Sequence, residues 1–117
     1  MINRKNELLV EEKENVRLGK GKVIFEKIVK QEDLRGKGKL FSKITILPGS
    51  SIGMHDHTDD FEVYYILKGK AKVFDNGEYV ELNEGDVVYT ADGQKHNIEN
   101  IGEDNLEFIA LVLNDQH

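Results

Sequence analysis

Short apolar runs separated by turn-forming residues recur along most of the chain, and this pattern constrains the fold more than any other feature. From Val23 to Leu113, runs of four to eight residues rich in Val, Ile, Phe and Tyr alternate with sequences such as Pro48-Gly49 and Lys68-Gly69. No apolar pattern of helical period continues for more than about two turns. Regularly spaced short strands of this kind predict an all-β sandwich or barrel.

The most specific turn signal is Asp75-Asn76-Gly77. An Asn-Gly pair readily adopts the positive φ angles that a two-residue hairpin turn requires. We therefore expect strands near residues 70–75 and 78–82 to pair with each other.

Two predicted strands are apolar on both faces. In residues 61–67 and 106–113, both sets of alternating positions carry mainly large apolar side chains. Antiparallel strands usually present one polar face to water, so a second apolar face indicates that something covers it. In a chain of this size the simplest cover is a second copy, which predicts a homodimer.

The length of 117 residues fits one domain. We expect residues 1–22 to form an N-terminal arm or edge strand, residues 23–114 a barrel domain, and residues 115–117 a loose C-terminus. With 16 basic and 22 acidic residues, the net charge of −6 argues against nucleic acid or an anionic membrane as a partner. The sequence shows no secretory signal and no membrane-spanning run, so we expect a cytoplasmic protein. It has no cysteine, so a transition-metal site would use nitrogen and oxygen ligands.

Two of the four histidines stand near a glutamate in a pattern typical of metal ligands. His55 and His57 are two residues apart, which places them on one face of a strand. The turn-prone residues 58–60 let the chain reverse, so that two adjacent strands would bring Glu62 beside them. His96 is available as a fourth donor. Neutral imidazole and carboxylate together suit divalent first-row metals.

The spacing of these residues resembles the two signatures of the cupin superfamily. Gly49, His55, His57, Glu62 and Gly69 match the first signature. The second signature is matched by Gly85, Gly93, His96 and Asn100, with Ala91 where the family usually has proline.

The resemblance implies an antiparallel jelly-roll β-barrel that holds one divalent transition metal through His55, His57, Glu62 and His96. Mn, Fe, Co, Ni, Cu and Zn all suit such a site, so the metal's identity stays open. Members of the family are often dimers, which agrees with the doubly apolar strands. Tyr64 and Ile66 share the Glu62 face of their strand and either line the pocket or fill the barrel.

Two functions follow from this arrangement. A metal-dependent enzyme, with dioxygenase or isomerase-like activity, would act on a small polar molecule at open metal positions. Alternatively, a non-catalytic module would bind or sense a small molecule through the metal. Arg35, Lys37 and Lys39 are interpreted as a solvated loop, with a basic rim for an anionic ligand as the alternative.

Overall fold

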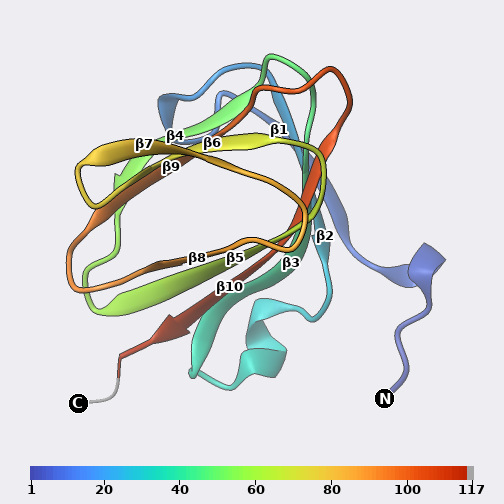
Figure 1. The fold of residues 1–117 in the computed structure, drawn as a ribbon. Helices are drawn as coiled ribbons and strands as arrows, with labels where there is room; N and C mark the ends of the chain where they lie inside the picture. The colour runs from blue at the N-terminus through green and yellow to red at the C-terminus, as the bar shows by residue number, and fades with distance from the viewer. Residues whose placement is uncertain (116–117) are drawn as a thin grey trace.

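The computed structural model describes residues 1–115, which form two antiparallel β-sheets facing each other (Figure 1). One sheet has six strands in the order β1-β2-β3-β10-β5-β8, and the other has four in the order β4-β9-β6-β7. The predicted all-β jelly-roll fold is confirmed. Within the described residues, no helix is long and apolar enough to cross a membrane.

The strands of the six-stranded sheet are β1 (Val10–Glu14), β2 (Lys22–Lys27), β3 (Gly38–Ile46), β5 (Asp60–Lys68), β8 (Val87–Thr90) and β10 (Leu106–Asn114). Those of the four-stranded sheet are β4 (Ser51–Asp56), β6 (Ala71–Asp75), β7 (Glu78–Leu82) and β9 (Lys95–Asn100). Three short 3-10 helices complete the chain: η1 (Lys5–Glu7), η2 (Val16–Leu18) and η3 (Gln31–Leu34).

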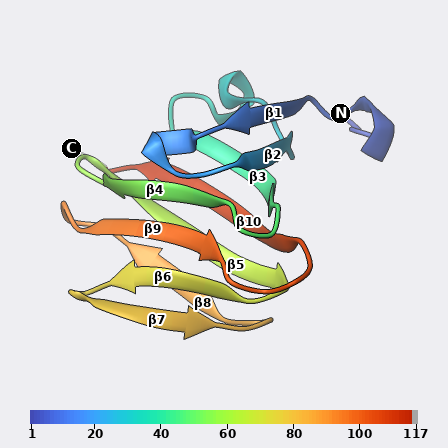
Figure 2. The same cartoon turned by 90° about the horizontal axis from the view of Figure 1, so that it is seen from above.

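The N-terminal residues take part in the larger sheet. β1 forms its edge and pairs with β2 in antiparallel register, Val10 opposite Glu26 (Figure 2). At the other end of the chain, the backbone N–H of Asp115 donates to the carbonyl of Asp59. The rest of the predicted loose C-terminus, residues 116–117, lies outside the described residues. The domain boundaries themselves stay a prediction.

The core lies between the two sheets. It is formed by inward-facing residues such as Ile44, Phe108 and Ile98, which are almost completely buried. Along β5, however, the inward-facing residues change character: Ile66 and Tyr64 are followed, towards the start of the strand, by Glu62 and Asp60. The space between the sheets is therefore apolar at one end and polar at the other, where the site lies.

The predicted hairpin is confirmed. β6 and β7 pair in register with Asp75 opposite Glu78, and Asn76 and Gly77 take φ values of 50° and 82°. A Cβ at Gly77 would have no atom within 4 Å, so its substitution tests backbone conformation alone.

We expect Gly77→Ala to lower the free energy of unfolding by about 1 kcal/mol, because alanine is strained at positive φ. Urea denaturation measures this effect. As a control, Lys72→Ala in β6 changes an ordinary strand position in the same hairpin. An unchanged urea midpoint for Gly77→Ala would contradict the assigned turn.

Candidate metal centre

The four predicted ligands come together from both sheets. His55 on β4 and His96 on β9 stand directly opposite each other in the four-stranded sheet. His57 follows the end of β4, and Glu62 projects inward from β5. The expectation that two adjacent strands bring Glu62 beside the histidines was wrong in detail. β4 and β5 belong to different sheets, so Glu62 meets the histidines across the interior.

The donor atoms converge on one carboxylate oxygen. Glu62 Oε1 lies 2.9 Å from His96 Nε2, 3.0 Å from His57 Nε2 and 3.6 Å from His55 Nε2. His96 Nε2 is 2.8 Å from His55 Nε2 and 3.1 Å from His57 Nε2. One ligand atom from each of the four residues lies within 4.8 Å of all the others.

Each imidazole is held from behind at its Nδ1 atom. His55 Nδ1 donates to the carbonyl of Gly53 at 2.8 Å, and His57 Nδ1 donates to Asp60 Oδ1 at 2.7 Å. His96 Nδ1 is 2.9 Å from the hydroxyl oxygen of Thr90. A carbonyl and a carboxylate can only accept, so Nδ1 carries a hydrogen in His55 and His57. When such a ring is neutral, the lone pair of Nε2 points inward and can bind a metal ion, and when the ring is protonated, Nε2 donates to Glu62 instead.

This donor set fits a divalent transition metal. Nitrogen and oxygen ligands bind such ions at about 2.1 Å, so two donors at right angles lie about 3.0 Å apart. Most of the separations above are close to that value. The group His55, His57, Glu62 and His96 could therefore hold a metal ion.

The electrostatics of the cluster favour an ionised glutamate among imidazoles. Burial alone would raise the pKa of Glu62, but hydrogen bonds from His55, His57 and His96 hold it far below its ordinary value. Burial opposes protonation of His57, yet its hydrogen bonds to Glu62 and Asp60 raise its pKa. For His96, burial outweighs Glu62 and lowers the pKa. The carboxylate thus stays charged across the physiological range.

Asp60 links the cluster to the surface. Its Oδ1 accepts from His57, and its Oδ2 accepts from Lys39 Nζ at 2.6 Å. Burial would raise the pKa of Asp60, but the hydrogen bonds from Lys39 and His57 lower it. The carboxylate that orients His57 is therefore itself held in place by a lysine.

A cavity of about 310 Å³ opens beside the cluster. It is bounded by cluster residues, apolar side chains from both sheets and three basic residues, namely Lys13, Val16, Arg17, Phe25, Lys39, Leu40, Ile44, Ile52, His55, His57, Asp60, Glu62, Tyr64 and Val112. Tyr64 lines this cavity, and its ring stacks on His96 with centroids 4.9 Å apart. Ile66, the other residue considered for the lining, is fully buried in the core and is not part of the cavity wall.

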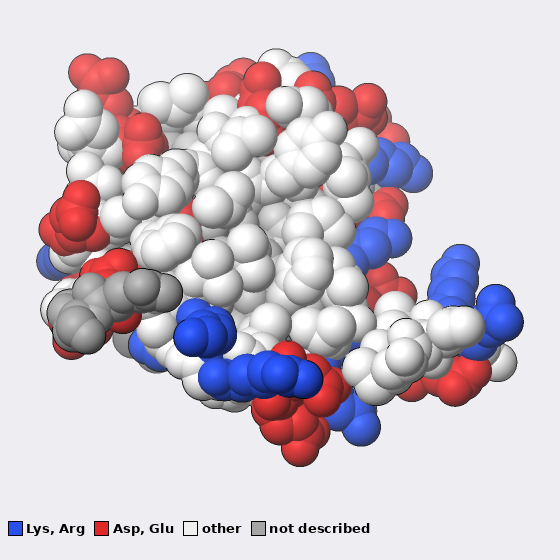
Figure 3. Space-filling model, turned by 90° about the horizontal axis from the view of Figure 1, so that it is seen from below, with Lys and Arg blue, Asp and Glu red and all other residues white. Residues whose placement is uncertain are grey.

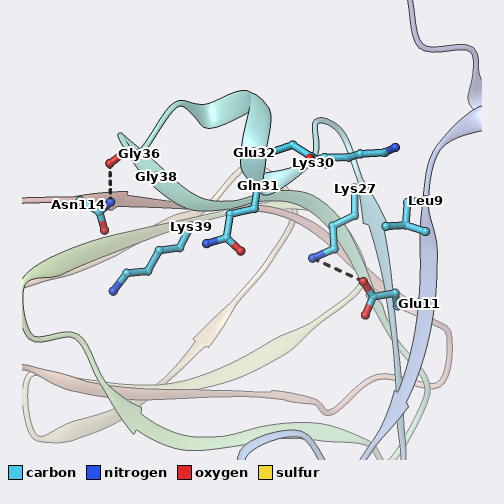
Figure 4. A pocket seen from close by; sticks show the side chains of 10 residues that line it. All are labelled: Leu9, Glu11, Lys27, Lys30, Gln31, Glu32, Gly36, Gly38, Lys39 and Asn114. Carbon is cyan, nitrogen blue, oxygen red and sulfur yellow. Dashed lines mark hydrogen bonds and ion pairs between the residues drawn. The ribbon is translucent and has the colours of Figure 1, made fainter.

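A larger hollow of about 720 Å³ lies outside the barrel between η3, β1, β2 and the start of β3 (Figure 4). Its charged groups are partly paired, since Lys27 Nζ lies 3.9 Å from Glu11. Lys39 lines both this hollow and the cavity beside the cluster. The candidate site is therefore the smaller cavity, which is lined by three of the four converging donors, His55, His57 and Glu62, whereas the larger hollow is lined by none of them.

Sequence reasoning missed part of this site. Asp60 was interpreted as a turn-forming residue, although its spacing of three from His57 already allowed a hydrogen bond. Lys39 was assigned mainly to a solvated loop. Lys13 and Arg17 lie in the predicted arm, and no local signal places an arm against a cavity wall. Their position depends on how β1 and η2 pack.

Two facing antiparallel sheets that enclose a three-histidine, one-glutamate cluster define a small β-barrel with a group of residues that could hold a metal ion. The family model for the Cupin domain matches residues 42–112, which include all four cluster residues. The chain therefore belongs to the cupin family, as its two signatures predicted.

Relatives of known name support this assignment. The chain is 41% identical over 113 residues to the "Oxalate-binding protein" of Thermotoga maritima, covering 97% of this chain and 93% of that protein. It also matches a Thermotoga maritima crystal structure described as a "predicted oxalate decarboxylase", with a TM-score of 0.92 and 40% identity over 98% of this chain and all of the other. KdgF from Halomonas sp. shares the fold, with a TM-score of 0.75 and 14% identity over 98% of this chain and 96% of that one.

We expect one divalent metal ion per chain, and we expect its release on acidification. Each histidine must be neutral to coordinate, so protons compete increasingly as the pH falls through and below about 6.5. Elemental analysis after dialysis at a series of pH values measures the loss. His57→Ala with a wild-type metal content would contradict the ligand assignment.

Asp60→Asn should weaken metal binding about tenfold or more, because the charge that orients His57 is lost. Competition with a chromophoric chelator measures the affinity. Asp56→Asn is the matched control, since Asp56 is exposed on the same strand as His55 and makes the same change in charge. Equal metal affinities for the two variants would show that Asp60 does not support the site.

Proposed function

We propose that this protein binds a small carboxylate, with oxalate as the leading candidate, at a metal ion held by His55, His57, Glu62 and His96. The observation that carries this proposal is the charge around the cavity. The chain has a net charge of −6, yet Lys13, Arg17 and Lys39 all line the cavity that is also lined by His55, His57 and Glu62. A bound divalent ion would supply further positive charge and open coordination positions.

The relatives support the choice of ligand class. The "Oxalate-binding protein" of Thermotoga maritima is 41% identical to this chain over almost its whole length. Oxalate is small enough for a cavity of about 310 Å³, and its oxygens suit both a metal and basic side chains. The apolar walls provided by Ile52, Val112 and Phe25 restrict the space to a compact ligand.

The side chains of the cavity favour binding without turnover. Among the described residues, the carboxylates that line it are Asp60 and Glu62, and both already accept hydrogen bonds from cations or imidazoles. Burial raises the pKa of the Tyr64 hydroxyl well above its ordinary value, so it stays protonated at neutral pH. Asp60, Glu62 and Tyr64 are therefore not available as a free general base, because the two carboxylates already accept hydrogen bonds and the tyrosine is protonated.

Oxalate should raise the melting temperature of the metal-loaded protein and leave the chelator-treated protein unchanged. A ligand stabilises only the state that it binds, and at one hundred times its Kd the gain is about 2.7 kcal/mol. Differential scanning fluorimetry with glycolate, pyruvate and oxalate makes the comparison. Equal shifts with and without metal would contradict metal-anchored binding.

Incubation of the metal-loaded protein with oxalate, under air and without air, tests the absence of turnover. We expect the oxalate concentration to stay constant in both. Consumption that disappears in His96→Ala would instead establish a metal-dependent enzyme.

We further infer that the protein is a homodimer formed through the outer face of the six-stranded sheet. Figure 3 shows a broad uncharged surface over this part of the sheet. Apart from Glu107, which pairs with Lys43, the outward positions of β5, β8 and β10 are apolar. They lie in matched register, namely Phe61, Val63, Tyr65, Leu67, Val87, Tyr89, Ile109, Leu111 and Leu113. Val87 and Tyr89 are each 58% exposed. A continuous exposed apolar surface is typical of a protein interface.

Light scattering should give a mass of two 13.3 kDa chains. Tyr65→Glu should shift the protein to monomer, because it places a charge in the centre of this surface. Tyr79→Glu is the matched control, since Tyr79 is a similarly exposed tyrosine on β7 of the other sheet. Wild-type protein that is monomeric at micromolar concentration would overturn the inference.

A further inference from the structure

The segment around η2 has an unusual backbone. Asn15, Arg17 and Leu18 take φ values of 54°, 54° and 64°, a region that residues other than glycine rarely adopt. Leu18 is 98% exposed, so the conformation does not serve to bury its side chain. Strain of this kind persists only where the surrounding structure holds it, and it clusters at ligand-binding positions.

The turn is fixed against β4 by close backbone contact. A Cβ atom at Gly53 would collide with the carbonyl oxygen of Arg17, and a Cβ atom at Gly19 would collide with that of Ser51. The backbone N–H of Lys20 donates to the Ser51 hydroxyl at 3.0 Å. Val16 packs against the hydrophobic core. The backbone of Arg17 is therefore positioned by the same strand that carries His55.

Arg17 is the cavity cation that has no acidic partner. Lys39 is bound to Asp60, and Lys13 Nζ lies 3.4 Å from Glu11. Within residues 1–115, no carboxylate forms an ion pair with Arg17. Arg17 lines the same cavity as His55, Glu62 and Tyr64. A guanidinium binds a carboxylate through two parallel hydrogen bonds.

A dicarboxylate has oxygens that the metal cannot take up. Four protein ligands leave at most two positions on a six-coordinate ion, whereas oxalate has four oxygens. At least two oxygens therefore stay outside the metal's coordination and need another partner. Glycolate also chelates, but it carries one carboxylate and a single negative charge.

We propose that Arg17 is the specificity-determining residue of this site, binding the oxygens that the metal leaves free and thereby selecting dianionic over monoanionic ligands. This inference rests on the proposed function, because it assumes a metal-anchored carboxylate. The strained turn fixes the backbone of Arg17 against β4 and so places this residue at the cavity wall.

Calorimetric titration of the Mn²⁺-loaded protein with oxalate and with glycolate tests the proposal. Arg17→Gln should weaken oxalate binding about 10- to 100-fold, the range for a lost hydrogen bond to a charged group. Glycolate binding should change less than about threefold, and Mn²⁺ affinity should not change. Arg17→Lys should give an intermediate loss, since it keeps the charge but not the paired hydrogen bonds. Arg4→Gln is the control, an arginine outside the cavity wall.

The outcomes separate the two proposals. Wild-type protein that binds neither acid would overturn the proposed function. Wild-type protein that binds oxalate, together with an Arg17→Gln variant of equal affinity, would overturn only the role of Arg17. Equal losses for oxalate and glycolate would likewise overturn selection by charge. Gly19→Ala, which displaces the turn, should also weaken oxalate binding, and unchanged oxalate binding would contradict positioning by the turn.

Discussion

Three imidazoles can face one another at about 3 Å only if each is fixed in position, and the hydrogen bonds at Nδ1 meet this condition. Gly53, Asp60 and Thr90 hold the three rings from behind. Each partner belongs to a different part of the barrel: β4, the start of β5 and the end of β8. The site thus depends on the two sheets being closed on each other, and its donor geometry is prepared before any ion arrives.

The interior between the sheets is polar at the start of β5 and apolar towards its end, and this separation lowers the cost of burying the polar cluster. Burying a carboxylate is costly unless it is paired, and Glu62 is surrounded by three imidazole nitrogens. Behind it, Tyr64 stacks on His96 and contacts Phe108 edge-on, so the polar cluster passes directly into the apolar core. A single strand therefore supplies a metal ligand, a pocket wall and core packing at successive inward positions.

The sequence allowed the fold and the four donors to be predicted because both depend on local patterns. The strand rhythm, the Asn76-Gly77 turn and the spacing of His55, His57 and Glu62 are each visible within a short stretch of sequence, and His96 stands within the second signature, which is itself short. The supporting residues could not be found in this way. Arg17 reaches the cavity through the packing of η2 on β4, a contact between segments about 35 residues apart. Lys39 supports the site only by binding Asp60, and the sequence indicates for Asp60 no more than a place in a turn.

The prediction that Glu62 lies beside His55 and His57 is right, but the strand arrangement from which it was argued is only partly right. The prediction required a reversal at residues 58–60, and the structure has one, with Asp59 at a φ of 67° and β5 beginning at Asp60. The reversal carries the chain into the opposite sheet instead of a neighbouring strand. Alternation along a strand shows which residues share a face, but it does not show which sheet the face belongs to.

The net charge of the cluster and its ligand determines whether a basic residue beside the cavity is needed. With neutral histidines, a divalent ion and the Glu62 carboxylate leave one net positive charge, and Lys39 is neutralised by Asp60. A monoanion would bring this centre to neutrality without further help. A dianion would leave one negative charge in a partly buried space, which is unfavourable unless a cation lies beside it. Arg17 is the cation that can meet this requirement, because Lys13 already has Glu11 as a partner. The strained turn thus places beside the cavity the cation that the second negative charge of the proposed ligand requires.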